Sequence, residues 1–302
     1  MSFDHILFFP VTAYDAHGNV DPDLTSAHIQ SRMTYHPGAI FAACGTGEFY
    51  ALSSTEVGTV VRAAVTAVDG AAPVFSGAGG PLGHALECAR NAADSGANGL
   101  LVMPPYLVQG NQRGIVAYVE AIASATPLPI IVYHRANAQL TPESFARLLQ
   151  NPSIIGFKDG VGDIGLAQQL VRVAAASERT DLAFFNGLLT AEMSQDAYRA
   201  IGVPFYSSAI FAMAPKVATM FFNTYPHDDN VTRIRILDQF IRPLVALRDR
   251  QTGYSVALIK AGVRLRGLNV GGVRPPLSDP QSNDLEELER ILVIGDELSA
   301  LA

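Results

Sequence analysis

The 302-residue chain has no tryptophan, two cysteines and only 16% charged residues. Two cysteines, Cys44 and Cys88, are too few for a disulfide scaffold or a cysteine-based metal cluster, so reduced thiols are the simplest expectation. No stretch approaches the roughly 20 apolar residues of a membrane-spanning helix. The N-terminal segment lacks the basic start of a secretion signal, and Pro10 and Asp15 interrupt its short apolar run. We therefore expect a soluble, cytoplasmic protein with no membrane partner.

Basic residues are also fewer than acidic ones. The chain has 21 basic against 28 acidic residues, a formal net charge of −7. Such a chain lacks the basic face that nucleic acids require, so we expect no nucleic-acid partner. A local site for an anionic small molecule is still compatible with this charge. Apolar residues, in contrast, make up 49% of the chain and predict a large core.

Short and continuously apolar runs recur through the first two-thirds of the chain, as expected for strands that are covered on both faces. Helix-like stretches with N-terminal capping signals lie between them, such as Ser53 ahead of Glu56 and Thr141 ahead of Pro142. The eight runs are ILFFPVT (6–12), AIFAACG (39–45), APVFSGAG (72–79), GLLVMPP (99–105), PIIVYHR (129–135), IIGFK (154–158), LAFFNG (182–187) and VPFYSSA (203–209).

Eight strand–helix units in succession predict an α/β fold, a (β/α)₈ TIM barrel. An open, doubly wound sheet is the main alternative. After residue 225 the alternation stops, and amphipathic patterns over 232–249 and 282–302 predict helices joined through 262–280. We therefore predict a catalytic barrel over residues 1–225 and a helical C-terminal extension over residues 226–302.

The carboxyl ends of the strands carry the chemistry in barrels of this kind, and the run IIGFKDG ends there in a lysine. Apolar surroundings disfavour the charged form of an amine, so the pKa of Lys158 should fall. An unprotonated lysine attacks ketones and forms a Schiff base. The alternative, which position alone favours, is an outward lysine that pairs with Asp159.

Two further features lie at neighbouring strand ends. Tyr133 ends the fifth run, where a phenol could transfer protons to and from a Schiff-base intermediate. A core tyrosine with a satisfied hydroxyl is the alternative. The turn formed by Gly45, Thr46 and Gly47 offers backbone N–H groups and a hydroxyl to a carboxylate, although a plain tight turn explains it equally well.

Other chemistries have weaker support. His134 has no second ligand at metal-binding spacing, so we predict no metal site. Cys44 has no accompanying histidine motif and is best interpreted as a small buried thiol. Ser207 and Ser208 lack a G-x-S-x-G elbow, which argues against a serine hydrolase. The GAGG stretch at 77–80 lacks the third glycine of a dinucleotide-binding fingerprint.

The motifs GTGEF (45–49), PPY (104–106), VYHRAN (132–137) and GFKDG (156–160), with the eight-unit layout, resemble the dihydrodipicolinate synthase and N-acetylneuraminate lyase family over nearly the whole chain. The resemblance implies a (β/α)₈ barrel with a helical C-terminal extension and no cofactor other than a covalent imine on Lys158. It implies Tyr133 as the proton-transfer group. Gly45 replaces the first hydroxyl residue of the family pattern G-[ST]-T-G-E, and Arg135 is displaced toward Tyr133. Both departures weaken an assignment as a synthase.

Four more stretches resemble the branch of this family that converts 5-dehydro-4-deoxyglucarate, a sugar diacid, to 2,5-dioxopentanoate, carbon dioxide and water. They are NGLLTAE (186–192), FYSSAIFAMAP (205–215), GYSVALIKAG (253–262) and VRPPL (273–277). The resemblance implies that the ketoacid carboxylate binds at Gly45, Thr46 and Gly47. It places the distal hydroxyls and the C1 carboxylate near Asn186, Gly187, Thr190, Ser207 and Ser208. Tyr106 resembles a tyrosine that relatives insert into a neighbouring subunit's site, which implies a homo-oligomer, either a dimer or a tetramer.

Three alternatives remain open from the sequence. An aldolase or a synthase-like enzyme acting on a related 2-keto acid would share Lys158 and Tyr133; an aldolase would cleave the same substrate between C3 and C4 to pyruvate and tartronate semialdehyde. A ligand-binding or regulatory protein on a catalytically inactive barrel would form no imine. A nicotinamide-dependent enzyme would bind its cofactor at residues 77–80.

Overall fold

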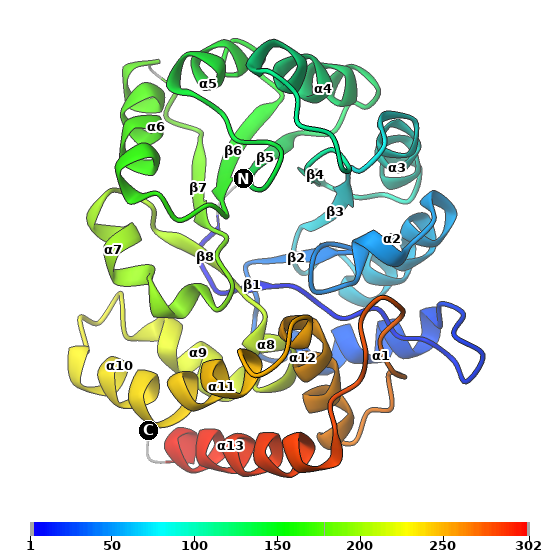
Figure 1. Ribbon diagram of the computed structural model, residues 1–302, viewed down its shortest axis with the longest axis vertical. Helices are drawn as coiled ribbons and strands as arrows, with labels where there is room; N and C mark the ends of the chain where they lie inside the picture. The colour runs from blue at the N-terminus through cyan, green and yellow to red at the C-terminus, as the bar shows by residue number, and fades with distance from the viewer. Residues whose placement is uncertain (1–2, 178, 301–302) are drawn as a thin grey trace.

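The computed structural model describes residues 3–177 and 179–300, and its centre is a closed barrel of eight parallel strands (Figure 1). Each strand pairs with the next along the chain, and β1 (Leu7–Phe8) closes the barrel against β8 (Phe205–Ser208). The predicted (β/α)₈ fold is therefore confirmed. The other strands are β2 (Ala39–Ala42), β3 (Val74–Ala78), β4 (Gly99–Val102), β5 (Ile130–His134), β6 (Ile154–Asp159) and β7 (Ala183–Asn186).

Helices surround the barrel, and two of them begin at the capping signals seen in the sequence (Figure 1). At α2 (Ser54–Val68) the Ser53 hydroxyl accepts the backbone N–H of Glu56, whose carboxylate accepts the backbone N–H of Ser53. At α5 (Pro142–Leu148) the hydroxyl of Thr141 caps the first turn. The other helices are α1 (Pro22–Met33), α3 (Leu82–Asp94), α4 (Gln112–Ser124), α6 (Ile164–Ala176), α7 (Gln195–Ala200), α8 (Ile210–Met213), α9 (Pro215–Asn223), α10 (Asn230–Ile236), α11 (Arg242–Arg248), α12 (Tyr254–Leu265) and α13 (Ser282–Ala300), with the short 3-10 helices η1 (Phe49–Ala51) and η2 (Ala191–Met193) and the π-helical turn η3 (Leu237–Ile241).

Alternate residues of each strand enter two separate apolar cores, one inside the barrel and one between strands and helices. Inside the barrel the ring of Phe41 stacks on those of Phe9 and Phe75, with centroids 4.5 and 5.0 Å away. On β6, Phe157 points outward to the helix layer, so Lys158, the next residue, points into the barrel. The pleat of the strand therefore aims this lysine at the barrel axis.

The C-terminal helices lie together along one side of the barrel, next to β8 and β1 (Figure 1). The sequence predicted helices over 232–249 and 282–302. The structure has the first, interrupted by η3, and the second as far as residue 300, and residues 301–302 lie outside the described part of the chain. It adds α12, which the sequence analysis treated in part as a connection. This helix is buried from residue 257 to residue 263 and lacks the polar stripe of a surface helix. The division of the chain at residue 225 stays a prediction.

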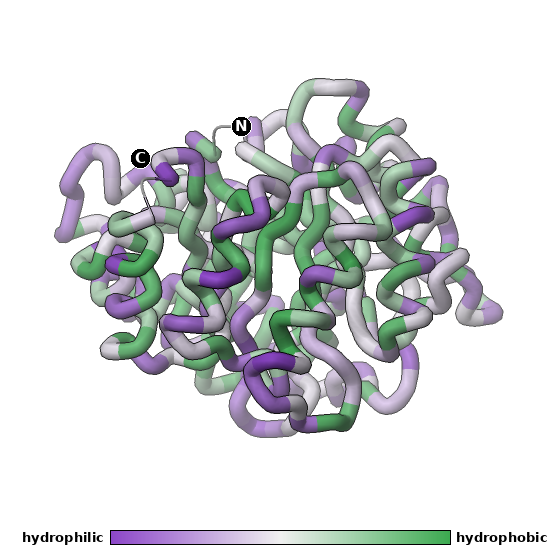
Figure 2. Tube along the Cα trace, turned by 90° about the horizontal axis from the view of Figure 1, so that it is seen from above, coloured by the Kyte–Doolittle hydropathy of each residue, from purple (hydrophilic) through white to green (hydrophobic). Residues whose placement is uncertain are grey.

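Hydrophobic segments concentrate in the interior of the molecule and hydrophilic ones mainly along its periphery (Figure 2). Within residues 3–177 and 179–300, no helix combines the length and the apolar character needed to span a bilayer.

Candidate active site

A cavity of about 370 Å³ lies at the carboxyl ends of the barrel strands, a volume typical of small-molecule sites. Its walls come from strand ends and their following loops, and from α11 and α12 of the C-terminal segment. Seven of the residues predicted from the sequence line this one cavity: Gly45, Thr46, Tyr133, Lys158, Gly187, Thr190 and Ser207.

Lys158 is the most deeply buried basic side chain of this cavity, with 6% of its surface exposed. Its Nζ lies 4.2 Å from the ring centroid of Phe9 and 4.5 Å from that of Tyr133. Burial lowers the pKa of Lys158 from its ordinary 10.5 to about 7. A large fraction of the amine is thus unprotonated near neutral pH.

The alternative in which Lys158 pairs with Asp159 is wrong. Asp159 faces the helix layer, where its carboxylate accepts the hydroxyl of Tyr198 and the backbone N–H groups of Val161 and Gly162. Successive side chains of a strand point to opposite faces, so the two residues are separated by the sheet itself.

Tyr133 lies beside Lys158 on the adjacent strand, and the two residues are register partners in the β5–β6 pair. Its hydroxyl donates to the backbone carbonyl of Gly187 over 2.9 Å and accepts from Nη1 of Arg135 over 2.7 Å. Burial raises the pKa of this phenol above its ordinary value, so Tyr133 is protonated at neutral pH. Two contacts therefore hold the protonated hydroxyl, and the ring that carries it lies against the amine.

The turn after β2 presents Gly45 and Thr46 to the cavity, whereas Gly47, also predicted to bind the substrate, does not line it. The carbonyl of Gly47 accepts the hydroxyl of Thr12 over 2.7 Å. The turn ends at Glu48, which adopts a left-handed conformation with φ of 59°. Few non-glycine residues adopt this conformation, so the contacts of Glu48 must hold the turn in place.

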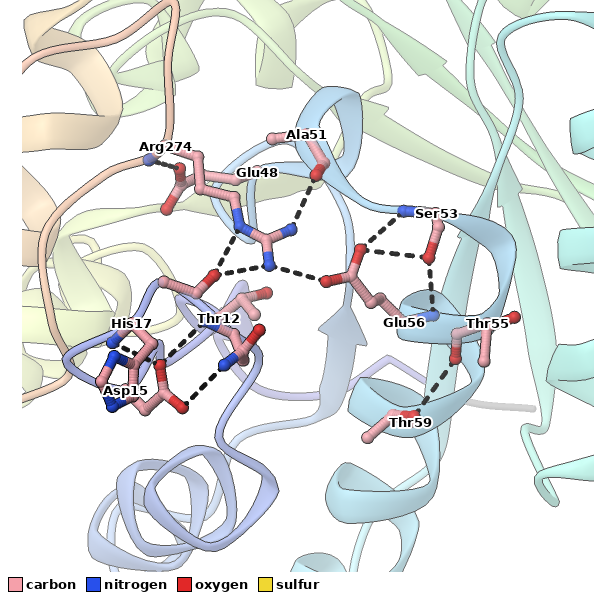
Figure 3. Close-up of polar contacts among 12 residues, drawn as sticks. Thr12, Asp15, His17, Glu48, Ala51, Ser53, Thr55, Glu56, Thr59 and Arg274 are labelled. Atoms are coloured by element: carbon pink, nitrogen blue, oxygen red, sulfur yellow. Dashed lines mark hydrogen bonds and ion pairs between the residues drawn. The ribbon is translucent and has the colours of Figure 1, made fainter.

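Glu48 connects the turn to the C-terminal segment. One carboxylate oxygen accepts from Lys260 Nζ over 2.7 Å, and both side chains are fully buried. The other oxygen accepts the backbone N–H of Arg274 over 2.8 Å (Figure 3). Burial lowers the pKa of Lys260 to about 8, against the opposing effect of Glu48. One buried carboxylate thus joins the β2 turn, α12 and the segment that precedes α13.

The guanidinium of Arg274 extends this network to the first turn of α2 (Figure 3). It donates to the carbonyls of Gly18 and Ala51 and to the carboxylate of Glu56, which also completes the cap of α2. The C-terminal segment therefore anchors the loops on both sides of the turn that lines the cavity.

The structure does not bring Asn186 and Ser208 to the cavity, which corrects the placement expected from the sequence. The amide of Asn186 donates to the carbonyl of Ala191 over 3.0 Å, and the hydroxyl of Ser208 donates to Glu192 over 2.6 Å. Both side chains are fully buried on the outer face of the barrel. Their neighbours Gly187 and Ser207 face inward, as the alternation along a strand requires.

Tyr106 also lies outside the cavity of its own chain. It is 64% exposed in the loop after β4, followed by Leu107 and Val108, which are 78% and 68% exposed. Its predicted insertion into the site of a neighbouring subunit concerns a second chain and stays a prediction.

Arg248 is the main cavity residue that the sequence analysis missed. It is the last residue of α11, and its Nη1 donates to the hydroxyl of Thr190 over 2.6 Å. An arginine on an amphipathic helix ordinarily faces solvent, so no local signal pointed to a site. The chain separation of 58 residues means that only the fold brings it to Thr190.

Metal-ligating side chains do not gather in the part of the chain that the structure describes: no group of three or more His, Cys, Asp or Glu is arranged to hold an ion.

Comparison with known proteins gives consistent results. The model of the "Dihydrodipicolinate synthetase family" matches residues 2–294. A Streptomyces coelicolor protein named "Probable 5-dehydro-4-deoxyglucarate dehydratase 1" is 48% identical over 297 residues, which are 97% of this chain and 93% of the relative. A Paracidovorax citrulli protein named for the same activity is 38% identical over 288 residues, 95% of this chain and 94% of the relative. A crystal structure of dihydrodipicolinate synthase from Oceanobacillus iheyensis superposes with a TM-score of 0.88 over 98% of this chain and 97% of that one. At 24% identity it shows a shared fold alone.

Proposed function

The chain belongs to the dihydrodipicolinate synthetase family, and from this membership and the cavity we propose that it converts 5-dehydro-4-deoxyglucarate to 2,5-dioxopentanoate, carbon dioxide and water. The observation that carries the proposal is the buried amine of Lys158, with a pKa of about 7, beside the protonated phenol of Tyr133. The names of the relatives at 38% and 48% identity support the choice of substrate.

The reaction begins with the neutral amine of Lys158 attacking the C5 ketone. A carbon–nitrogen bond forms, the ketone oxygen leaves as water after taking up protons, and an iminium ion results. Tyr133 is the proton donor in this step because it is protonated at neutral pH and its ring centroid lies 4.5 Å from the amine of Lys158. Arg135 and the carbonyl of Gly187 hold the hydroxyl in position.

The iminium ion then serves as the electron sink for both later steps. It acidifies C4, and loss of a C4 proton gives an enamine whose electrons expel the C3 hydroxyl as water. The product is a conjugated iminium with a C3–C4 double bond. The C1–C2 bond breaks next, its electron pair moves through C2–C3 and C4–C5 to the nitrogen, and carbon dioxide leaves. The resulting dienamine takes up a proton at C4. The enol at C2–C3 takes up a proton at C3 and loses its hydroxyl proton, which gives the aldehyde. Hydrolysis of the imine then releases 2,5-dioxopentanoate, and the whole sequence consumes one proton.

The charges that line the cavity suit a dianionic substrate. Two guanidinium groups line it, from Arg135 and Arg248, together with the amine of Lys158, and no carboxylate does within the described residues. The carboxylate next to the ketone is assigned to the turn at Gly45 and Thr46, whose amides and hydroxyl suit an anion. Because the imine is the electron sink, the proposal requires no cofactor.

A homo-oligomer in the cytoplasm completes the proposal. Cys44 and Cys88 are buried free thiols, which suits a reducing compartment. The exposed Tyr106, Leu107 and Val108 offer an apolar surface to a second subunit.

Product analysis tests the reaction. The wild-type enzyme and Lys158→Met are incubated with 5-dehydro-4-deoxyglucarate, and the solution is analysed by NMR and for released carbon dioxide. We expect equal amounts of 2,5-dioxopentanoate and carbon dioxide with the wild type and neither with the variant. Pyruvate and tartronate semialdehyde in their place would show aldol cleavage at C3–C4 instead.

A further inference from the structure

The C-terminal segment contributes one charged group directly to the cavity, the guanidinium of Arg248. The side chain is only 17% exposed although it ends a surface helix. Nη1 donates to Thr190 and Nε donates to Asp249 over 2.8 Å. Nη2 has no hydrogen-bond partner among the described residues, so the guanidinium retains donor capacity at the cavity wall.

Thr190, the residue that Arg248 contacts, has an unusual backbone conformation. Its φ of 50° and ψ of 64° are left-handed, and a β-branched residue rarely adopts this region. Such strain persists where the surroundings over-determine it, and it concentrates at ligand sites. The hydrogen bond from Arg248 holds the hydroxyl of Thr190 at the cavity wall.

The position of this pair matches the far end of the substrate. The imine fixes C5 at Lys158 on β6, and the adjacent carboxylate is assigned to the turn after β2. In an eight-stranded closed barrel β2 lies opposite β6, whereas the loop with Thr190 follows β7, next to β6. The four remaining carbons then extend toward the wall formed by Thr190 and Arg248. Arg135, the other cavity arginine, already contacts the hydroxyl of Tyr133.

We propose that Arg248, supported by Thr190, binds the distal C1 carboxylate and thereby selects 2-oxo diacids over 2-oxo monoacids. This inference rests on the proposed function and adds the group that recognises the second carboxylate. Charge-assisted hydrogen bonds between a guanidinium and a carboxylate are strong, and the planar guanidinium fits the geometry of the two carboxylate oxygens. The N-terminal turn of α12, through Ser255 and Val256, lines the same cavity and adds backbone dipoles that favour an anion.

The role is one of binding rather than of bond breaking. Arg248 stabilises the charged carboxylate in the bound substrate, and carbon dioxide leaves uncharged, so the contact does not strengthen in the transition state for decarboxylation. Loss of the contact should therefore raise KM while kcat changes little.

Two ligands of equal chain length separate recognition from turnover. 2-Oxoadipate carries a distal carboxylate and 2-oxohexanoate does not. Neither acid has a hydroxyl at the carbon that corresponds to C3 of 5-dehydro-4-deoxyglucarate, so neither undergoes elimination. For each acid, intact-protein mass spectrometry measures the concentration at which half of the protein is trapped by borohydride as the imine. The proteins are the wild type, Arg248→Gln, Arg248→Lys and the control Arg242→Gln, which removes an exposed arginine of the same helix.

We expect the wild type and Arg242→Gln to prefer 2-oxoadipate by about 10- to 100-fold, Arg248→Gln to lose this preference, and Arg248→Lys to keep part of it. A preference that survives in Arg248→Gln would overturn the inference, and so would an equal loss of imine with both acids. If the wild type fails to convert 5-dehydro-4-deoxyglucarate but still prefers 2-oxoadipate through Arg248, the proposed substrate is wrong and the role of Arg248 in binding a carboxylate is supported. No imine with either acid would refute both proposals.

Discussion

A Cβ atom on Gly187 would lie 2.5 Å from Cε and 2.7 Å from Cγ of Lys158, so the stem of the lysine occupies the space of the missing side chain. Gly160 stands in the same relation to Tyr133, where a Cβ atom would lie 2.7 Å from the ring and 3.0 Å from the hydroxyl oxygen. Both candidate catalytic side chains are thus packed directly on glycine backbone. Close packing against these two glycines therefore fixes the positions of both side chains.

Replacing Gly187 with alanine should displace the amine of Lys158. We expect kcat/KM to fall about 100-fold or more, because a misplacement of about 1 Å costs that much. The matched control is Gly83→Ala, where a Cβ atom meets nothing within 4 Å. Steady-state kinetics on both variants checks the prediction, and full activity in Gly187→Ala would show that the packing does not position the amine.

Removing the hydroxyl of Tyr133 should separate proton transfer from imine chemistry. In Tyr133→Phe we expect kcat to fall about 10²- to 10⁴-fold, the usual contribution of a positioned acid or base. Imine trapping on Lys158 should persist at a reduced rate. The control Tyr118→Phe removes a phenol that donates to Gly80 outside the cavity. Unchanged turnover in Tyr133→Phe would assign the proton transfer to another group.

Lys158 should destabilise the fold that contains it, and the effect should depend on pH. Its pKa is lowered from 10.5 to about 7, so the unfolded chain binds more protons than the folded one between these values. Stability therefore rises with pH across this window, and the cost of the lysine is greatest at pH 7 and below. We expect Lys158→Met to raise Tm at pH 7 and to raise it less at pH 9. Equal Tm values for the two proteins at both pH values would mean that the amine is not desolvated.

The buried pair of Glu48 and Lys260 should behave as a unit. Glu48→Gln or Lys260→Met leaves an uncompensated buried partner and should cost about 3–5 kcal/mol of unfolding free energy. The double variant should recover part of this loss, because neither charge is then left alone. Urea denaturation of the four proteins measures the coupling. Additive losses would contradict a direct interaction across the 212 residues that separate them in the chain.

Much of the fold could be predicted from the sequence because most of the β-strands are buried on both faces. The run that ends at Lys158 is continuously apolar, and each of the eight such runs overlaps one barrel strand. The same runs carry a period of two that divides strand ends between cavity and helix layer. At the ends of the last two strands, this alternation places Gly187 and Ser207 at the cavity and Asn186 and Ser208 on the outer face of the barrel. The prediction from the sequence considered only which strand ends are polar, so it placed all four at the site.

The contribution of the C-terminal segment was not predictable in the same way. Arg248 and Lys260 have the local sequence of ordinary helices, and their roles depend on Thr190 and Glu48, which are distant in the chain. Helix propensity and capping residues indicate where a helix begins and ends. They do not indicate which part of the barrel rim the helix packs against, because that depends on the folded molecule.

Trapping of the imine tests the central claim most directly. The chain has three lysines, Lys158, Lys216 and Lys260, so a borohydride-reduced adduct can be assigned by peptide mass spectrometry. We predict an adduct of 5-dehydro-4-deoxyglucarate, or of the product derived from it, on Lys158 alone, with a trapping rate that rises through a pKa of about 7. Turnover without an adduct on Lys158, or an adduct on Lys260 in its place, would contradict the account.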